Sequence, residues 1–167
     1  MPCCWNGMDN KQISIDKINE YLEEKTCYLD LSSLELTELP EAISELIDLE
    51  VLDISDNQLT ALPDSISSLV NLEWLFINNN QLTELPNKFC KLVNLAVLEV
   101  NNNLLTKLPK KINQLNLVLL DVSNNQLTKL PKQFKKFGEL EKVYIDDNPL
   151  KIKSIKLRKF LKSRLGN

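Results

Sequence analysis

The chain has 167 residues, and 43% of them are hydrophobic, which is enough for one domain with a substantial core. It contains no histidine and only three glycines. These absences exclude Ser-His-Asp and Cys-His catalysis, remove the commonest transition-metal ligand and leave no glycine-rich phosphate-binding loop of either common spacing. The composition therefore predicts a globular protein that is not an enzyme and holds no cofactor and no metal ion.

The formal net charge of −3 is the sum of two halves of opposite sign. Residues 1–83 carry three basic and 16 acidic side chains, for a local net charge of −13. Residues 84–167 carry 17 basic and seven acidic side chains, for a local net charge of +10. Such a dipolar distribution directs charged partners more strongly than the total charge does.

Residues 1–12 are interpreted as a flexible tail. The tail lacks the charged and apolar segments of a secretory leader, and no glycine or basic cluster beside Cys3 and Cys4 indicates lipidation. The four cysteines form no C-x-x-C pair, which favours a reducing compartment. The longest purely apolar run, residues 117–120, is too short to span a bilayer. We therefore expect a cytoplasmic protein.

Residues 13–25 are predicted to form an N-terminal helical cap. Ile13 and Ile18 flank Ser14 in the pattern of a hydrophobic staple around an N-cap residue. Ile15, Ile18 and Leu22 form an apolar stripe that is expected to cover the exposed edge of the first strand.

Residues 26–150 contain six tandem units. Proline recurs after leucine, and asparagine recurs after a short apolar stretch, with nearly the same spacing. The prolines are spaced 23, 23, 23 and 22 residues apart and the asparagines 23, 23, 22 and 23 residues apart: Pro40, Pro63, Pro86, Pro109 and Pro131; Asn57, Asn80, Asn103, Asn125 and Asn148. Self-similarity at this period is the mark of a repeat architecture.

Each unit has a physical interpretation. Its Leu-x-x-Leu-x-Leu segment alternates apolar residues and predicts a short strand with one buried face. The asparagine follows where the chain leaves the strand, and its amide can satisfy backbone groups that the turn leaves unpaired. The residue before proline favours extended geometry, and the closing Ile/Phe-x-x-Leu/Phe predicts a loose helical turn. Stacked units would bury a continuous leucine core beneath parallel strands.

These motifs resemble the leucine-rich repeat family, in its 22-to-24-residue form. The resemblance implies an α/β fold, a right-handed curved solenoid with short parallel strands on the concave face and irregular or short helical turns on the convex face. Two departures stand out. The first unit has Leu34 where the others have asparagine, and one residue is missing between Leu115 and Leu117, which is expected to tighten the outer arc.

Residues 151–167 are predicted to form a basic C-terminal helical cap. Seven basic residues and no acid lie between Lys151 and Leu165. An apolar helical face is expected to close the solenoid: Ile152, Ile155, Leu157, Phe160, Leu161 and Leu165. The alternative interpretation is a basic amphipathic helix that binds a membrane surface.

One surface carries the candidate function. Residues between the buried leucines point onto the concave face, where four adjacent units place aliphatic and aromatic side chains beside one another with acidic side chains around them. The predicted partner-binding residues are Tyr28, Val51, Asp53, Glu73, Trp74, Phe76, Val97, Glu99, Leu119, Asp121 and Tyr144. Trp and Tyr are enriched at binding hot spots, whereas lateral packing along the strands is the competing explanation.

The sequence therefore predicts a non-catalytic module, monomeric when free, that binds a protein through an apolar, acid-rimmed concave face and has no small-molecule substrate. Its resemblance to compact bacterial leucine-rich-repeat effector proteins implies a protein delivered into a host cytosol that binds and inhibits a partner enzyme. The alternative is binding of nucleic acid or a membrane surface through the lysine-rich C-terminal half. That alternative is disfavoured because the lysines have no interleaved aromatic residues.

Overall fold

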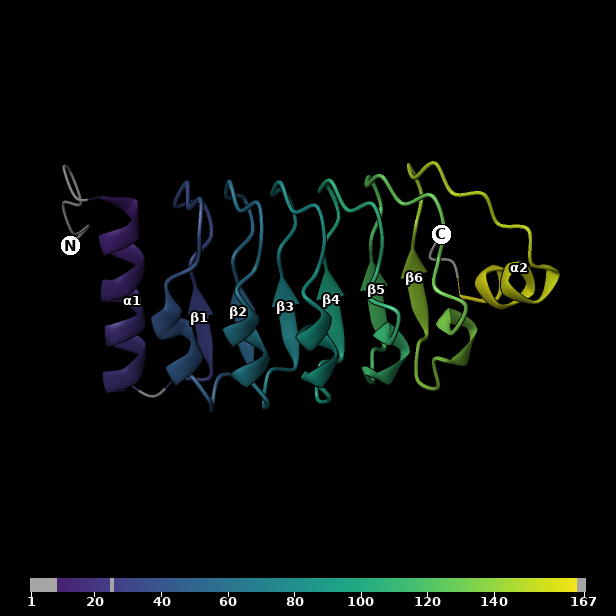
Figure 1. Cartoon of the computed structure of the whole chain (residues 1–167). Helices are drawn as coiled ribbons and strands as arrows, with labels where there is room; N and C mark the ends of the chain where they lie inside the picture. Colours follow the sequence, from purple (N-terminus) through teal and green to yellow (C-terminus); the bar gives the residue numbers. More distant parts are fainter. Residues whose placement is uncertain (1–8, 25, 165–167) are drawn as a thin grey trace.

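Six three-residue strands form a single parallel sheet in which neighbours in sequence are neighbours in space. The computed structural model describes residues 9–24 and 26–164. Figure 1 shows the units following one another along the molecule, with helix α1 at one end and helix α2 at the other. The strands are β1 (Tyr28–Asp30), β2 (Val51–Asp53), β3 (Trp74–Phe76), β4 (Val97–Glu99), β5 (Leu119–Asp121) and β6 (Lys142–Tyr144). This is the predicted solenoid.

Short 3-10 helices form the convex side of the first five units, where the sequence predicted a loose helical turn. They are η1 (Glu41–Glu45), η2 (Asp64–Ser68), η3 (Asn87–Lys91), η4 (Ile112–Gln114) and η5 (Phe134–Lys136). Prolines with extended ψ angles precede the first three, as at Pro63 with a ψ of 151°. The core fills the space between these turns and the sheet, and the central residue of each strand is buried. η4 and η5 have three residues each, whereas η1, η2 and η3 have five, so the shorter helix is not confined to the unit that lacks one residue.

An asparagine ladder joins each unit to its neighbour, and it consists of Asn57, Asn80, Asn103, Asn125 and Asn148. The Oδ1 of Asn80 accepts a hydrogen bond from the N–H of Leu59 at 2.9 Å. Its Nδ2 donates to the carbonyl oxygens of Ile54 at 2.9 Å and Ile77 at 3.2 Å. The residue before each ladder asparagine has a φ between 48° and 56°. This is a left-handed conformation, in which Asp and Asn are the most tolerated non-glycine residues. The predicted role of the asparagines is confirmed.

Helix α1 (Asn10–Glu24) covers the edge of β1, but it begins earlier than the sequence indicated. The predicted N-cap at Ser14 is wrong. The carboxylate of Asp9 instead accepts a hydrogen bond from the N–H of Lys11 at 3.2 Å, and the helix starts at Asn10. Ser14 lies inside the helix, fully buried, because its hydroxyl donates to the carbonyl of Lys11 at 2.8 Å and needs no other partner.

The buried stripe of α1 also differs from the predicted one. Ile18 and Tyr21 pack in the core, whereas Ile15 is half-buried and Leu22 remains 38% exposed. The Nζ of Lys17 donates to the carbonyl of Asp30 at 2.8 Å and so ties the helix to β1. The packing angle of the helix, which its own periodicity does not specify, selects the face that is buried.

Helix α2 (Ile155–Lys162) closes the opposite end of the solenoid. Ser154 caps it, since its Oγ accepts a hydrogen bond from the N–H of Leu157 at 3.3 Å. Leu161 is buried, and Ile152, Leu157 and Phe160 pack against the core. Ile155 is 70% exposed, so its predicted place on the apolar face is wrong, because the first helical residue projects away from the last repeat. Leu165 lies outside the described residues.

Aromatic and backbone contacts hold this cap in place. The rings of Phe160 and Phe134 meet edge to face with centroids 6.3 Å apart. The N–H of Val143, in the edge strand β6, donates to the carbonyl of Arg164 at 2.8 Å. The Nε of Arg164 in turn donates to the carbonyl of Leu140 at 2.6 Å. These bonds occupy backbone groups that an uncapped edge would leave open.

The asparagine ladder predicts a large stability loss in Asn103→Ala. That change leaves the buried N–H of Leu82 without a partner and removes one of the two side-chain amide donors from each of the carbonyls of Ile77 and Val100, at a cost of about 2 kcal/mol. Urea unfolding measures the difference in free energy of unfolding. The matched control is Asn101→Ala, on the concave face of the same unit, and equal losses in the two variants would contradict the role of the ladder.

Candidate functional site

The parallel register aligns the predicted concave-face residues in columns. In the first column, Trp74 lies between Val51 and Val97, and Leu119 follows. Tyr28 and Lys142 are the two ends of that column. In the second column, Phe76 lies between Asp53 and Glu99, and Asp121 and Tyr144 follow. Residues 23 or 22 positions apart in sequence thus become lateral neighbours.

The centre of the concave face is an apolar patch, the concave patch, which consists of Val51, Trp74, Phe76, Val97 and Leu119. Trp74 is 47% exposed, although its neighbours in the first column are half-buried. The rings of Trp74 and Phe76 meet edge to face with centroids 6.3 Å apart and planes at 76°. This contact holds both rings on β3, and the accessible face of Trp74 has no partner within the described chain.

Acidic side chains surround the patch and are held by a local motif. Asp53 accepts hydrogen bonds from the hydroxyl of Ser55 at 2.6 Å and from its N–H at 2.9 Å. Asp121 makes the same two bonds with Ser123, at 2.6 and 2.8 Å. This Asp-x-Ser motif was not predicted, although its recurrence at the period of the repeat is a sequence signal for it. The motif fixes the aspartates in one orientation, so the rim is preorganised.

Glu99 is an acidic residue of the concave face whose ionised form is disfavoured by its surroundings. Burial, together with the neighbouring carboxylates of Asp121 and Asp53, raises the pKa of Glu99 above its usual value. At Asp30, burial alone would raise the pKa, but hydrogen bonds from the hydroxyl and N–H of Ser32 and the charge of Lys17 hold it below its usual value. The centre of the face therefore carries negative charge that a cation would stabilise.

Glu73 and the two tyrosines lie at the margins of this surface. Glu73 is exposed and directly precedes β3, with its N–H bonded to the carbonyl of Glu50 at 2.8 Å. Tyr28 is 48% exposed on β1, and its pKa is raised by burial of the hydroxyl and by the carboxylates of Asp30 and Asp53. Tyr144 is half-buried on β6 beside Asp121.

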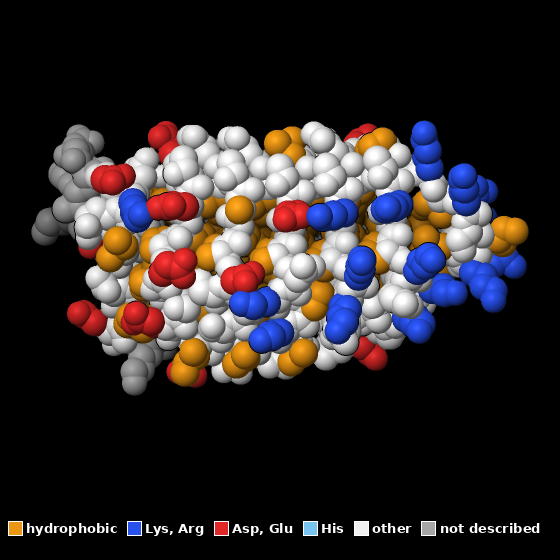
Figure 2. All heavy atoms as spheres, in the orientation of Figure 1, with side chains coloured by type: hydrophobic (Ala, Val, Ile, Leu, Met, Phe, Trp, Pro, Cys, Tyr) orange, Lys and Arg blue, Asp and Glu red, His pale blue; other side chains and the backbone are white. Residues whose placement is uncertain are grey.

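A second apolar feature, the aliphatic row, was not predicted. Ile47, Val70 and Val93 are 55%, 47% and 47% exposed, and each lies in the turn that leads from a 3-10 helix to the next strand. Asn71 and Asn94 donate side-chain hydrogen bonds to the carbonyls of Ile47 and Val70. Figure 2 shows hydrophobic side chains spaced along the lower margin of the molecule. An apolar residue every 23 positions before Asp or Asn is the sequence signal that could have identified the row.

The convex face separates charge by position along the solenoid. Figure 2 shows acidic side chains over the N-terminal units and basic side chains over the C-terminal units. Ion pairs form where the two regions meet, between Lys88 and Asp64 at 2.9 Å and between Lys107 and Glu84 at 2.6 Å. The opposite net charges of the two halves of the sequence therefore appear as an acidic region and a basic region on this face.

The remaining candidate chemistry is limited. Cys27 is exposed just before β1, and Cys90 is buried in η3, where burial raises the pKa of its thiol. Within residues 9–24 and 26–164, no three His, Cys, Asp or Glu side chains come together as a metal site. No helix in that part of the chain has the length and apolar character needed to cross a bilayer. Cys3 and Cys4 lie outside the described residues.

Comparison with known proteins identifies the class. A family model described as a leucine-rich repeat region matches residues 4–104, and a leucine-rich repeat model matches residues 116–137. The chain belongs to the leucine-rich repeat family, whose members typically serve as non-catalytic modules for protein–protein interaction. No curated protein matches the chain.

Solved structures agree with this assignment. A leucine-rich repeat protein of Leptospira interrogans is 37% identical with a TM-score of 0.72, over 78% of this chain and 33% of its own. A chain of the Drosophila Toll–Spatzle complex is 30% identical with a TM-score of 0.67, over 80% of this chain and 18% of its own. YopM, a leucine-rich effector protein of Yersinia pestis, is 28% identical with a TM-score of 0.65, over 86% of this chain and 44% of its own. The chain thus spans less than half the length of each of these three proteins.

The raised pKa of Glu99 predicts a pH-dependent gain of stability in Glu99→Gln. Ionisation of Glu99 costs more in the folded chain than in the unfolded chain, where its pKa is about 4.5. The variant should therefore have the higher Tm at about pH 7, and the difference should fade as the pH falls below about 4.5, where both side chains are neutral.

Thermal unfolding of the parent, Glu99→Gln and Glu73→Gln at several pH values measures this effect. Glu73→Gln is the control, because Glu73 is exposed and lies outside the second column. A Tm difference for Glu99→Gln that stays constant with pH, or that Glu73→Gln matches, would contradict the electrostatic explanation.

Proposed function

We propose that this chain is a binding module that holds a partner protein on its concave face, with Trp74 as the principal anchor. One observation carries the proposal: a tryptophan at the centre of the sheet, fixed by an edge-to-face contact with Phe76, is 47% exposed. An aromatic side chain buries about 150–250 Å² when it is covered, and Trp is among the residues most enriched at hot spots.

The size of the surface supports a protein partner rather than a small ligand. The concave patch extends over four strands, β2 to β5, and is continuous because the register has no offset. Two aromatic rings and three aliphatic side chains supply several hundred Å² of contact. Together with the rim, they approach the roughly 800 Å² that each partner contributes to a standard protein interface.

The charge of the rim specifies the chemistry of the partner. Asp53, Glu99 and Asp121 lie in one column, with Phe76 between Asp53 and Glu99. Burial, together with the carboxylates of Asp121 and Asp53, raises the pKa of Glu99. A lysine or arginine of the partner placed over this column would relieve the repulsion and lower that pKa. The partner that fits best presents an apolar group to Trp74 with basic residues beside it, and rim charges mainly accelerate association.

The similar proteins support this class of function and suggest a setting. One solved relative is part of a complex, Toll–Spatzle, and another, YopM, is described as an effector. On this basis we extend the proposal to a bacterial effector that acts in a host cytosol as a monomer and inhibits an enzyme by covering it. Identification of a partner within the source organism's own housekeeping machinery would remove this extension and leave the binding face itself untouched.

The concave patch predicts that the double variant Trp74→Ala, Phe76→Ala loses affinity for a partner purified with the parent chain from source cells. Loss of both rings should weaken binding by about 100-fold or more, which corresponds to about 3 kcal/mol. The Tm should change little, because both side chains lie on the accessible face of the sheet. Titration calorimetry and thermal unfolding supply the two measurements.

The matched control is Val70→Ser, Val93→Ser, which removes exposed apolar surface from the aliphatic row of the same units. Unchanged affinity in the folded Trp74→Ala, Phe76→Ala variant would overturn the proposal. An equal loss in both double variants would show that the interface is not centred on the concave face.

A further inference from the structure

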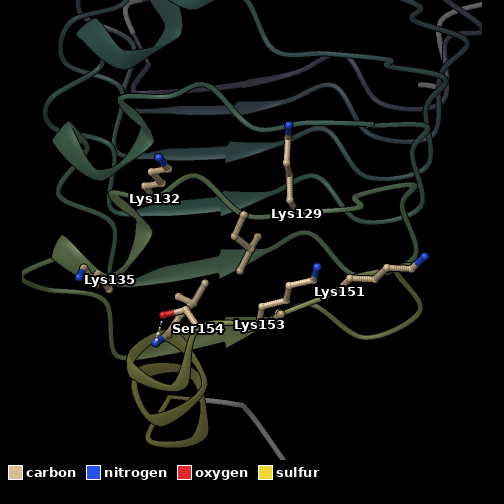
Figure 3. A pocket seen from close by; sticks show the side chains of 9 residues that line it. Lys129, Lys132, Lys135, Lys151, Lys153 and Ser154 are labelled. Atoms are coloured by element: carbon tan, nitrogen blue, oxygen red, sulfur yellow. Dashed lines mark hydrogen bonds between the residues drawn. The ribbon is translucent and has the colours of Figure 1, made fainter.

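A hollow of about 320 Å³ lies between the fifth unit and the segment that leads into the C-terminal cap. We call it the lysine basin. Its polar lining comes from two segments, one leading into and through the last 3-10 helix and one leading into α2, and these face one another in Figure 3. The lining residues are Lys129, Leu130, Lys132, Lys135, Lys151, Ile152, Lys153, Ser154 and Leu157.

The basin concentrates positive charge with no counter-charge. Five of its nine lining residues are lysines, and none is acidic. None of the five forms an ion pair with a described residue, in contrast to Lys88 and Lys107 on the same convex face.

The repeat explains why the basin lysines are unpaired. Glu84, Lys107 and Lys129 occupy the same position, before Leu-Pro, in three successive units. Lys107 pairs with Glu84 in the unit before it. The unit before Lys129 has Lys107 at that position, so Lys129 has no carboxylate there with which to pair. The charge at the position after each proline also changes from negative to positive along the chain: Asp64, Asn87, Lys110 and Lys132. Beyond the boundary between the two charged regions, no acidic column remains to neutralise the lysines.

The shape of the basin suits a compact ligand. Leu130, Ile152 and Leu157 form an apolar floor, and the lysine stems can lie along it while the ammonium groups reach water. Figure 3 shows the lysine ammonium groups spread around the rim of the basin. The amino-terminal end of α2, whose dipole is positive, begins at Ile155 beside this lining.

We propose that the lysine basin binds a small polyphosphate, in which several phosphate groups are carried on one compact scaffold. Five flexible ammonium groups around one hollow can neutralise several phosphates at once, whereas a single phosphate would leave most of them unpaired. The volume is near the lower end of small-molecule sites, about 300–1,000 Å³. The lining offers no aromatic ring on which a nucleic-acid base could stack and no arginine fork, which disfavours a single-stranded nucleic acid.

Titration calorimetry of the full chain with inositol hexakisphosphate tests this proposal. The triple variant Lys129→Gln, Lys132→Gln, Lys153→Gln removes three charges from the lining. Lys91→Gln, Lys110→Gln, Lys111→Gln removes three charges from the same convex face outside the lining and is the matched control. We expect one site per chain in the parent, at least a tenfold loss of affinity in the basin variant and a loss of about threefold or less in the control.

Three outcomes would overturn the proposal: no saturable binding by the parent, equal losses in the two triple variants, or tighter binding of an oligonucleotide with affinity that grows with its length. If the basin variant fails to fold, judged by circular dichroism, Lys153→Gln alone is used. Lys153 is exposed in the segment before α2, and its loss should still weaken binding more than Lys110→Gln does. Backbone amide shifts confined to the segments around Lys129–Lys135 and Lys151–Leu157 would further support the basin.

Discussion

The structure depends on one side-chain amide that recurs in five of the six units. Each ladder asparagine accepts a hydrogen bond from the preceding unit and donates to carbonyls of both units, as Asn103 does with Leu82, Ile77 and Val100. An amide is suited to this because it offers an acceptor and two donors within a single planar group. The bonds leave no freedom for one unit to slip against the next, and a stack of short strands thereby acquires a defined register. The leucines supply the driving force, and the ladder determines which positions become neighbours.

Because neighbouring strands pair without offset, residues at the same position of successive units become neighbours on the surface. On the strands this register places Trp74 and Phe76 between aliphatic and acidic neighbours, which creates an apolar surface with a negative border. On the convex side the same register aligns acids with acids and lysines with lysines, and ion pairs between successive units form where the sign changes, at Glu84–Lys107 and Asp64–Lys88. The two surfaces are opposite in chemistry as well as in position. The proposed protein partner and the proposed polyphosphate would therefore occupy separate surfaces of opposite charge.

The repeat itself could be predicted from sequence because its leucines recur in six units and its asparagines in five, all at a nearly constant period. The concave columns could be predicted for the same reason, since strand alternation and a constant spacing determine them. The ends could not. Ser14 was taken for a cap because its hydroxyl suits that role, but within a helix the same hydroxyl bonds to the carbonyl of Lys11 and can be buried. Ile155 was assigned to the core by helical spacing, yet docking through Phe160 and Arg164 leaves it outside. These errors share a cause, because each cap occurs once and packs through tertiary contacts that the repeat does not specify.

The central claim is that Trp74 is covered when the chain engages its partner. The chain has two tryptophans, so Trp5→Phe leaves Trp74 as the only one. Labelling that variant with 5-fluorotryptophan gives a single ¹⁹F resonance that an unlabelled partner does not obscure, and its shift between H₂O and D₂O reports exposure of the ring. Burial of Trp74 predicts a displaced resonance and a diminished solvent isotope shift in the saturated complex. An unchanged resonance with an unchanged isotope shift, in a complex shown by calorimetry to be fully formed, would contradict it.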